Sequence, residues 1–311
     1  MKPRAWAALI AVYIVWGSTY LAIRFTIETI PPFISAGIRF LISGAILFAW
    51  RRLSGDPTPK KAEWRAASII GLLLLLGGNG ALVWAEQRVP SGIASLFIAT
   101  VPLWMVMIDS LRPGGTRANW ITWLGVLIGL FGIALLANPW QARSAGNPPV
   151  DPVGIIVLLI GALSWSIGSL YSRKASLPSS PLLGTGMEML VGSVGLFAFA
   201  TLIGEWSQFD ISAVSIRSIS GLTYLIIFGS GIGFVAYTWL LRNAPTTIVS
   251  TYAYVNPVVA ILLGSIIANE TLEKIEIISA IIIIAGVILI TSAKSFSARK
   301  AATIPITPGE D

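Results

Sequence analysis

The chain has 311 residues, of which 55% are hydrophobic and only 11% charged, and its net charge is +7. A soluble domain carries roughly 25% charged residues, so this composition indicates a polytopic membrane protein without a sizeable soluble domain. With no cysteine and no histidine, the sequence excludes disulfides, thiol chemistry, zinc or haem sites of the usual kind and histidine-based catalysis. The positive charges lie between apolar runs, which favours membrane orientation over nucleic-acid binding.

Ten apolar segments are long enough to cross a bilayer, which takes about 20 apolar residues. The first is expected to be a retained span rather than a signal peptide, because its apolar run is longer than a typical h-region and has no obvious small-x-small cleavage site. Residues 294–311 are predicted to form a polar tail. In chain order the predicted spans are 5–27, 33–50, 66–86, 91–110, 120–138, 153–172, 181–203, 217–240, 246–267 and 275–293.

The two halves of the chain, 1–138 and 153–293, are predicted to be copies of one unit of five spans, joined by a loop at 139–152. A shift of 149 residues, and one of 155 in the later spans, superimposes matched residues, among them Trp16 on Trp165, Arg39 on Glu188, Trp84 on Trp239 and Pro102 on Pro257. Because five is odd, the second copy must cross the membrane upside down. The predicted fold class is therefore an all-α polytopic membrane protein of two inverted five-helix repeats, the arrangement on which many secondary transporters are built.

The basic residues predict which side of the membrane each end occupies. Of the 21 lysines and arginines, fifteen lie in segments on the side of the N-terminus and four on the opposite side, and the other two lie in spans. The positive-inside rule places both termini in the cytoplasm. The 139–152 loop is then periplasmic and the 294–311 tail cytoplasmic.

Charged residues inside spans are candidates for coupling or gating, since they are costly there. Arg39 and Glu188 occupy matching positions with opposite signs. They form a candidate pair, although each could instead satisfy a different polar neighbour or extend towards an interface. Glu86, at the outer end of the third span, is a candidate proton carrier or simply a loop carboxylate. Asp109 and Arg112 are interpreted as an ion pair at a helix end.

Matched helix breakers occur in the third and eighth spans, at Gly77-Gly78-Asn79-Gly80 and Gly229-Ser230-Gly231-Ile232-Gly233. Glycines of this kind allow either close helix packing or an unwound segment that lines a cavity. Pro102 and Pro257 are predicted to kink the fourth and ninth spans and to act as bend points for gating.

Aromatic and amide side chains are the candidates for solute contact. Ring faces with hydroxyl donors suit amphipathic or aromatic solutes, and also cations, while packing against lipid is the alternative for any one of them. Asn256, which precedes Pro257, either satisfies the carbonyl that the proline frees or faces the pathway. The predicted solute-binding residues are Trp16, Tyr20, Asn79, Trp165, Tyr237, Tyr252 and Asn256.

No enzyme class has a candidate constellation in this sequence. There is no phosphate-binding P-loop, so ATP is not expected to drive the protein directly. No catalytic residue, metal site or cofactor is predicted.

Several longer motifs resemble the EamA family of the drug/metabolite transporter superfamily, and within it the YedA-type exporters. They include Trp16-Gly17-Ser18-Thr19-Tyr20, Ala85-Glu86-Gln87 and Tyr252-Ala253-Tyr254-Val255-Asn256-Pro257. The resemblance implies ten helices around a central cavity formed largely by spans one, three, four, six, eight and nine. It also implies export of small metabolites, such as amino acids or amphipathic compounds, by alternating access.

The sequence therefore predicts a carrier in a bacterial inner membrane, with a small-molecule solute and membrane lipids as its partners and no nucleic acid. An uncoupled facilitator is the first alternative, and a non-transporting membrane scaffold or sensor the second. Proton coupling and a homodimeric assembly stay open.

Overall fold

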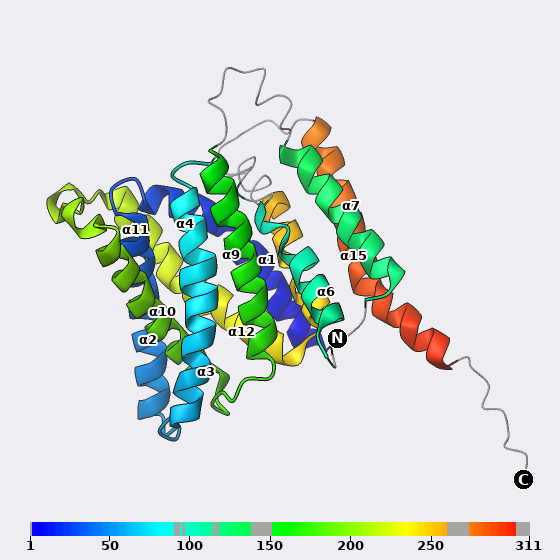
Figure 1. Cartoon of the computed structure of the whole chain (residues 1–311), viewed down its shortest axis with the longest axis horizontal. Helices are drawn as coiled ribbons and strands as arrows, with labels where there is room; N and C mark the ends of the chain where they lie inside the picture. The colour runs from blue at the N-terminus through cyan, green and yellow to red at the C-terminus, as the bar shows by residue number, and fades with distance from the viewer. Residues whose placement is uncertain are drawn as a thin grey trace, which may run out of the picture.

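The computed structural model describes residues 2–89, 94, 97–113, 115, 118–137, 151–259 and 274–302, and this part of the chain contains helices and loops but no strand (Figure 1). Six helical segments within it are long and apolar enough to cross a membrane. Shorter apolar helices at Val101–Leu111, Trp120–Leu135 and Ile277–Thr291 correspond to the fourth, fifth and tenth spans. Each of the ten predicted spans has a helical counterpart, which confirms the all-α polytopic fold of two five-helix repeats.

The first repeat contains five spans, the third of which is one continuous helix with a π-helical middle. In chain order its elements are α1 (Pro3–Thr26), α2 (Pro32–Leu53), α3 (Lys61–Gly71), the π-helix η1 (Leu72–Gly80), α4 (Ala81–Ala85), α6 (Val101–Leu111) and α7 (Trp120–Ala137).

The second repeat has the same order of elements, and its third span again has a π-helical middle. Its elements are α9 (Pro152–Ser172), α10 (Pro181–Leu202), the short 3-10 helices η2 (Glu205–Ser207) and η3 (Ile211–Ala213), α11 (Ile216–Tyr224), the π-helix η4 (Leu225–Phe234), α12 (Val235–Asn243), α13 (Thr246–Val249), a helix at 252–259 and α15 (Lys274–Ala302).

Proline starts four of the long helices, because its fixed φ suits the first turn and the missing N–H is not needed there. In the second repeat, polar side chains cap two of these starts. Asp151 accepts a hydrogen bond from the backbone N–H of Val153 at 2.9 Å, and Ser180 accepts one from Leu183 at 3.4 Å. These caps satisfy N–H groups that have no partner within the helix.

Turns interrupt the α-helix of the fourth and ninth spans ahead of their prolines. A turn at 99–100 precedes α6, so Pro102 lies in the first turn of a helix, where it costs no interior hydrogen bond. In the ninth span a turn at 250–251 separates α13 from the helix that contains Pro257. The interruption therefore lies before each proline. The predicted parts 91–93 and 260–267 of these spans lie outside the described residues.

Matched helices of the two repeats pack on each other. α2 packs against α10, and α7 against α15, while η1 lies on α9 in the same way that η4 lies on α1. Glycines allow the closest approaches: a Cβ on Gly44 would lie 3.0 Å from the carbonyl oxygen of Gly186, and one on Gly286 would lie 2.7 Å from the backbone nitrogen of Gly129. Small residues that let backbones approach are typical of membrane helix interfaces.

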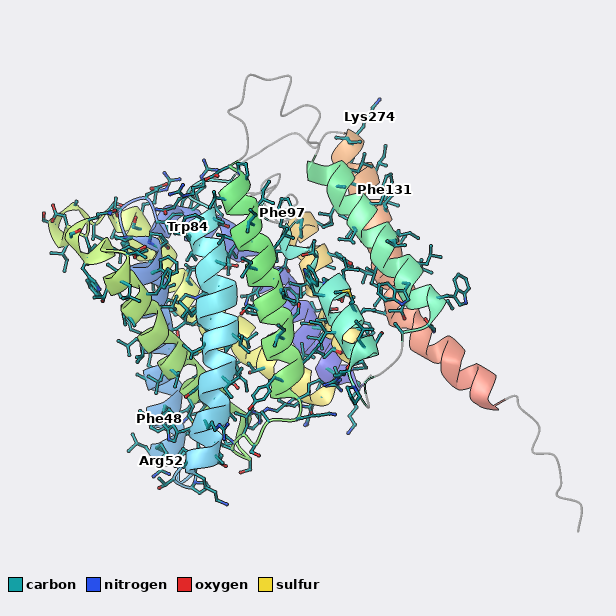
Figure 2. The ribbon with its side chains drawn as sticks, in the orientation of Figure 1. Phe48, Arg52, Trp84, Phe97, Phe131 and Lys274 are labelled. Carbon is teal, nitrogen blue, oxygen red and sulfur yellow. The ribbon has the colours of Figure 1, made fainter. Side chains whose placement is uncertain are left out.

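The start of α1 and the last turns of α15 lie towards the same end of the bundle (Figure 1). Arg52 and Phe48 lie at that lower end, whereas Trp84 lies near the upper end of α4 (Figure 2). This arrangement agrees with an even number of spans. α15 continues to Ala302, past the predicted end of the tenth span at 293. The predicted connecting loop falls almost wholly outside the described residues.

Candidate functional site

Four aromatic side chains from four spans meet at the centre of the bundle, with Trp16 of α1 in the middle. Its ring centroid lies 5.6 Å from that of Trp165 on α9, 5.0 Å from Tyr237 on α12 and 4.9 Å from Tyr252 in the helix at 252–259. The contacts with Trp165 and Tyr252 are edge-to-face, an arrangement that the ring quadrupoles favour. Trp16 and Trp165 are equivalent residues of the two repeats, so the halves of the fold meet through this pair.

Hydrogen bonds fix the orientation of these rings. The indole N–H of Trp165 donates to the hydroxyl oxygen of Tyr237 at 2.8 Å, and that hydroxyl lies 2.6 Å from the Oγ of Ser169. The indole N–H of Trp16 donates to the carbonyl oxygen of Gly229 at 3.1 Å. Because every polar edge has a partner, the ring faces are presented in a defined geometry.

A small cavity of about 70 Å³ lies beside this aromatic cluster. Tyr237 is buried behind it and does not line it. Ligand pockets usually measure about 300–1,000 Å³, so the cavity is contracted in this conformation. Six of the seven predicted solute-binding residues line it: Trp16, Tyr20, Asn79, Trp165, Tyr252 and Asn256.

Both π-helices contribute to the wall of the cavity. η1 supplies Gly78 and Asn79, and η4 supplies Phe234. A Cβ on Gly78 would lie 2.6 Å from the Trp165 ring, and a Cβ on Gly233 would collide with the Trp16 indole. The glycines therefore serve close packing of the tryptophans, and the chain stays helical instead of unwinding. π-Helical turns within α-helices are often found at functional sites.

The two asparagines are satisfied differently. The Oδ1 of Asn79 is buried without a hydrogen-bond partner among the described residues. Asn256 donates from its amide nitrogen to the carbonyl oxygens of Tyr252 at 3.0 Å and Tyr13 at 3.3 Å, in the amide orientation that satisfies both of its polar atoms. Asn256 thus holds backbone together as well as lining the cavity. Asn79 is therefore the amide whose oxygen can still accept a hydrogen bond.

Arg39 and Glu188 do not form an ion pair. Arg39 points into the central cavity, where its Nε donates to the Oγ of Ser230 at 2.8 Å and its guanidinium carbon lies 4.7 Å from the Phe40 ring centroid. Glu188 is buried on α10, and its closest electrostatic partner is Arg242 of α12. The two members of the predicted pair face different neighbours.

Glu188 and Arg242 are coupled but not joined by a salt bridge. Glu188 Oε2 and Arg242 Nη2 are both buried without hydrogen-bond partners among the described residues. Arg242 Nη1 donates to the carbonyl oxygen of Pro178 at 3.3 Å, and a hydrogen bond of 2.7 Å between Thr185 and Thr238 joins the same two helices.

Glu86 lies outside the cavity but close to it. Both of its carboxylate oxygens are buried without a hydrogen-bond partner in the described part of the chain. Tyr20 and Arg24 are the groups near enough to interact with it electrostatically. Asp109 and Arg112 form the predicted helix-end pair, at 2.6 Å.

Several lining residues were not predicted, among them Thr19, Phe40 and Phe234. Ser230, which accepts the hydrogen bond from Arg39 but does not line the cavity, was not predicted either. Thr19 lies in the Trp16 motif and Phe40 directly follows Arg39. Their closeness in sequence to predicted site residues was the one feature that could have identified them. The described residues include no group of three or more carboxylates, cysteines or histidines that could hold a metal ion.

The sequence profile of the EamA-like transporter family matches residues 4–138 and 152–292. The uncharacterized inner membrane transporter YedA of Escherichia coli K12 is 41% identical over 303 residues, which cover 96% of this chain and 94% of that protein. A WAT1-related chloroplastic protein of Arabidopsis thaliana is 26% identical and covers 92% of this chain and 69% of its own length. A solved crystal structure with 21% identity covers 97% of this chain and 100% of its own, with a TM-score of 0.75, and it supports the fold alone.

Proposed function

Because the chain belongs to the EamA-like transporter family, we propose that it moves small organic solutes out of the cytoplasm across a bacterial inner membrane by alternating access. The observation that carries this proposal is the meeting of Trp16 and Trp165, one from each repeat, at the cavity between the halves. Inverted-repeat transporters bind their solute near the midplane at the repeat interface. Here the interface offers ring faces with Asn79 beside them.

The character of the cavity supports an aromatic or amphipathic solute. Its wall is mostly ring faces and aliphatic groups, with a few polar side chains: Thr19, Tyr20, Arg39, Asn79 and Asn256. Ring stacking supplies apolar contact, while the unpartnered Oδ1 of Asn79 can accept a hydrogen bond from the solute. Tyr237 acts indirectly, because it holds the Trp165 indole in place.

A second, larger cavity of about 840 Å³ supports access from the side opposite the termini. It lies among the ends of α1, α2, α4 and α10 and includes Glu28, Arg88 and Glu205. No residue lines both cavities, and η1 contributes to each, through Gly77 on one face and Gly78 on the other. We propose that η1 is the partition that moves when the solute passes to this outer vestibule.

The interrupted spans supply flexible points for such a movement. At 99–100 and 250–251 the fourth and ninth spans depart from regular α-helix into turns, although backbone hydrogen bonds such as that from the Thr251 N–H to the Ile248 carbonyl oxygen continue there. These spans border the cavity through Val101 and Tyr252. Rocking of these segments would enlarge the contracted cavity. Pro102 and Pro257 each lack the backbone N–H that would bond to the carbonyl group four residues earlier, so the helix has one hydrogen bond fewer at each of these points.

Ion coupling by Glu86 is part of the proposal. A buried carboxyl group without hydrogen-bond partners, beside Tyr20 of the cavity wall, can bind a proton in one state and release it in another. The uncoupled facilitator is the alternative.

Counterflow in liposomes tests the function. Purified protein is reconstituted into vesicles loaded with one candidate solute, and accumulation of the labelled solute is measured for amino acids, sugars and aromatic acids, alcohols and amines. We expect saturable counterflow for aromatic compounds. Absence of counterflow for every class, with correctly folded protein in the vesicles, would contradict the proposal.

A further inference from the structure

Among the described residues that line the central cavity, Arg39 alone carries a full charge, and we propose that its guanidinium binds an anionic group of the solute. The solute would then be an aromatic compound with a carboxylate or a similar oxyanion. This inference rests on the proposed function, because it assigns the charge of the solute at the same site.

Arg39 is held in position by η4, not by an acidic side chain. The residue is 5% exposed, and its Nε donates to the Oγ of the fully buried Ser230 at 2.8 Å. Its guanidinium carbon lies 4.7 Å from the Phe40 ring centroid. A Cβ on Gly229 would lie 2.8 Å from Arg39 Nη2, so the bare backbone of Gly229 leaves the space that the guanidinium occupies. The site is therefore built around this cation.

The guanidinium has no counter-ion among the described residues. The four ion pairs recorded there join other groups, and none includes Arg39. Two buried carboxylates of the spans have other cationic neighbours, since Glu188 lies by Arg242 and Glu86 by Arg24. Only the Nε of Arg39 makes a hydrogen bond to a described residue. Nη1 and Nη2 thus keep N–H donors that no described residue uses.

An unpaired cation within a membrane is costly, and such residues usually face a pathway or a partner. A guanidinium presents two parallel N–H donors, which match the two oxygens of a carboxylate. With its Nε already bonded to Ser230, Arg39 can still present its two Nη groups. A bound anion would neutralise the charge of Arg39. The attraction between the two charges is strong because the surrounding side chains have a low dielectric constant.

The same charge decides between two classes of aromatic solute. The rings of Trp16, Trp165 and Tyr252 could by themselves attract an organic cation through their faces. Arg39 lines the same small cavity, so a cation bound there would be repelled at close range. We therefore infer that the cavity selects aromatic anions over matched alcohols and ammonium compounds.

The test compares three probes that share one ring and one chain length: phenylacetate, phenethyl alcohol and phenethylammonium. Binding to the purified full-length protein in detergent is measured by calorimetry. We expect phenylacetate to bind about ten- to hundredfold more tightly than the alcohol, the effect of a charge-assisted hydrogen-bonded pair, and the ammonium compound to bind weakest. Equal affinities, or no binding of phenylacetate, would overturn the inference.

Variants separate the role of the charge from folding. Arg39→Gln should abolish the preference for phenylacetate over the alcohol, whereas Arg39→Lys should keep part of it. Arg217→Gln serves as the control, because this arginine is exposed and distant from the cavity lining. A preference for phenylacetate that survives Arg39→Gln would contradict the inference. If that variant does not fold, the ratio of the wild-type affinities for phenylacetate and phenethyl alcohol is the test.

Counterflow with the same probes distinguishes this inference from the proposed function. Selective binding that depends on Arg39, without any counterflow, would refute the transport proposal and leave the anion site standing. Counterflow of phenethyl alcohol and phenylacetate at equal efficiency would refute the anion site alone.

Discussion

Trp16 and Trp165 meet edge-to-face at the centre of the bundle, with ring centroids 5.6 Å apart and ring planes at 78°. One comes from the first helix of each repeat, so their contact lies where the inverted halves join. Each indole N–H is bonded to the second repeat, to the Gly229 carbonyl oxygen and to the Tyr237 hydroxyl. The two indoles are thus tied by hydrogen bonds to η4 and α12. Through these bonds, a movement of either ring on solute binding could be coupled to movement of those helices.

Gly233 keeps the Trp16 indole in place, so Gly233→Ala is expected to impair transport. A Cβ at this position would collide with the indole nitrogen and its neighbouring ring carbon. A displacement of this kind near a binding site can cost about ten- to hundredfold in rate, measured as initial counterflow. Gly231→Ala is the matched control in the same π-helix, since its Cβ would meet only the Ile226 carbonyl oxygen at 3.4 Å. Equal effects of the two substitutions would show that Trp16 packing is not the cause.

Glu86→Gln is expected to make transport indifferent to an imposed pH gradient. The carboxyl oxygens of Glu86 are buried without hydrogen-bond partners in the described residues, so this group can change its protonation during the cycle. Uptake into vesicles is compared with and without a gradient. Glu63→Gln is the control, because Glu63 lines neither cavity and accepts the backbone N–H of Lys60 in an exposed hydrogen bond of 2.6 Å. A gradient response that persists in Glu86→Gln would assign coupling to another group, and a wild type without any response would favour the facilitator.

Glu188 and Arg242 are expected to act as one unit. Each has a buried atom without a partner, and each is the other's electrostatic neighbour across α10 and α12. Replacing one buried charge leaves the other uncompensated, a change that can cost about 3–5 kcal/mol. We therefore expect Glu188→Gln and Arg242→Gln each to abolish most transport while leaving membrane expression intact. The double variant should be no worse than the poorer single one, whereas additive losses would show that the two residues act independently.

Glu205 is expected to stabilise the fold from outside the spans. Its two carboxylate oxygens accept the backbone N–H groups of Phe33 at 3.2 Å and Ile34 at 3.0 Å, at the start of α2. Losing these bonds in Glu205→Ala should lower the free energy of unfolding by about 1–3 kcal/mol, measured by denaturation in detergent. Glu205→Gln keeps one acceptor and should lose less. Equal stability of the wild type and Glu205→Ala would contradict this role.

The same residue predicts a pH dependence of stability. Burial raises the pKa of the Glu205 carboxyl above its usual value, while the N–H groups of Phe33 and Ile34 oppose the shift. The folded state therefore binds the proton more tightly than the unfolded state does. The unfolding free energy of the wild type, relative to Glu205→Gln, should fall as the pH rises from the ordinary carboxyl range through the raised pKa. A difference that does not change with pH would contradict the shift.

Sequence periodicity predicted the spans and their inverted repetition, since hydropathy and repeat matching depend only on local pattern. It also nominated six of the residues that line the cavity as solute contacts, among them the matched pair Trp16 and Trp165. The same reasoning left open whether Arg39 and Glu188 pair or satisfy different neighbours, and the structure shows different neighbours. Residues related by a two-fold axis touch only when they lie near that axis, and sequence does not show how far from it they are.

The π-helices were beyond the reach of sequence for a different reason. Glycines in the third and eighth spans are compatible with close packing or with unwinding, and the choice depends on neighbouring helices that are distant in sequence. In the structure Gly78 packs on Trp165 and Gly233 on Trp16. Tertiary contacts therefore decided between the two alternatives. The bond from Arg39 to Ser230 is likewise a contact between residues 191 positions apart.

The central claim, that solute binds in the cavity between the repeats, is tested most directly by protection of an introduced thiol. The chain has no cysteine, so Asn79→Cys and Ala81→Cys each supply a single reactive site. Asn79 lines the central cavity and Ala81 the outer one. We predict that a solute active in counterflow slows modification of Asn79→Cys by a small methanethiosulfonate several-fold and leaves Ala81→Cys unchanged. Unaltered modification of Asn79→Cys at saturating concentrations of that solute would contradict the account.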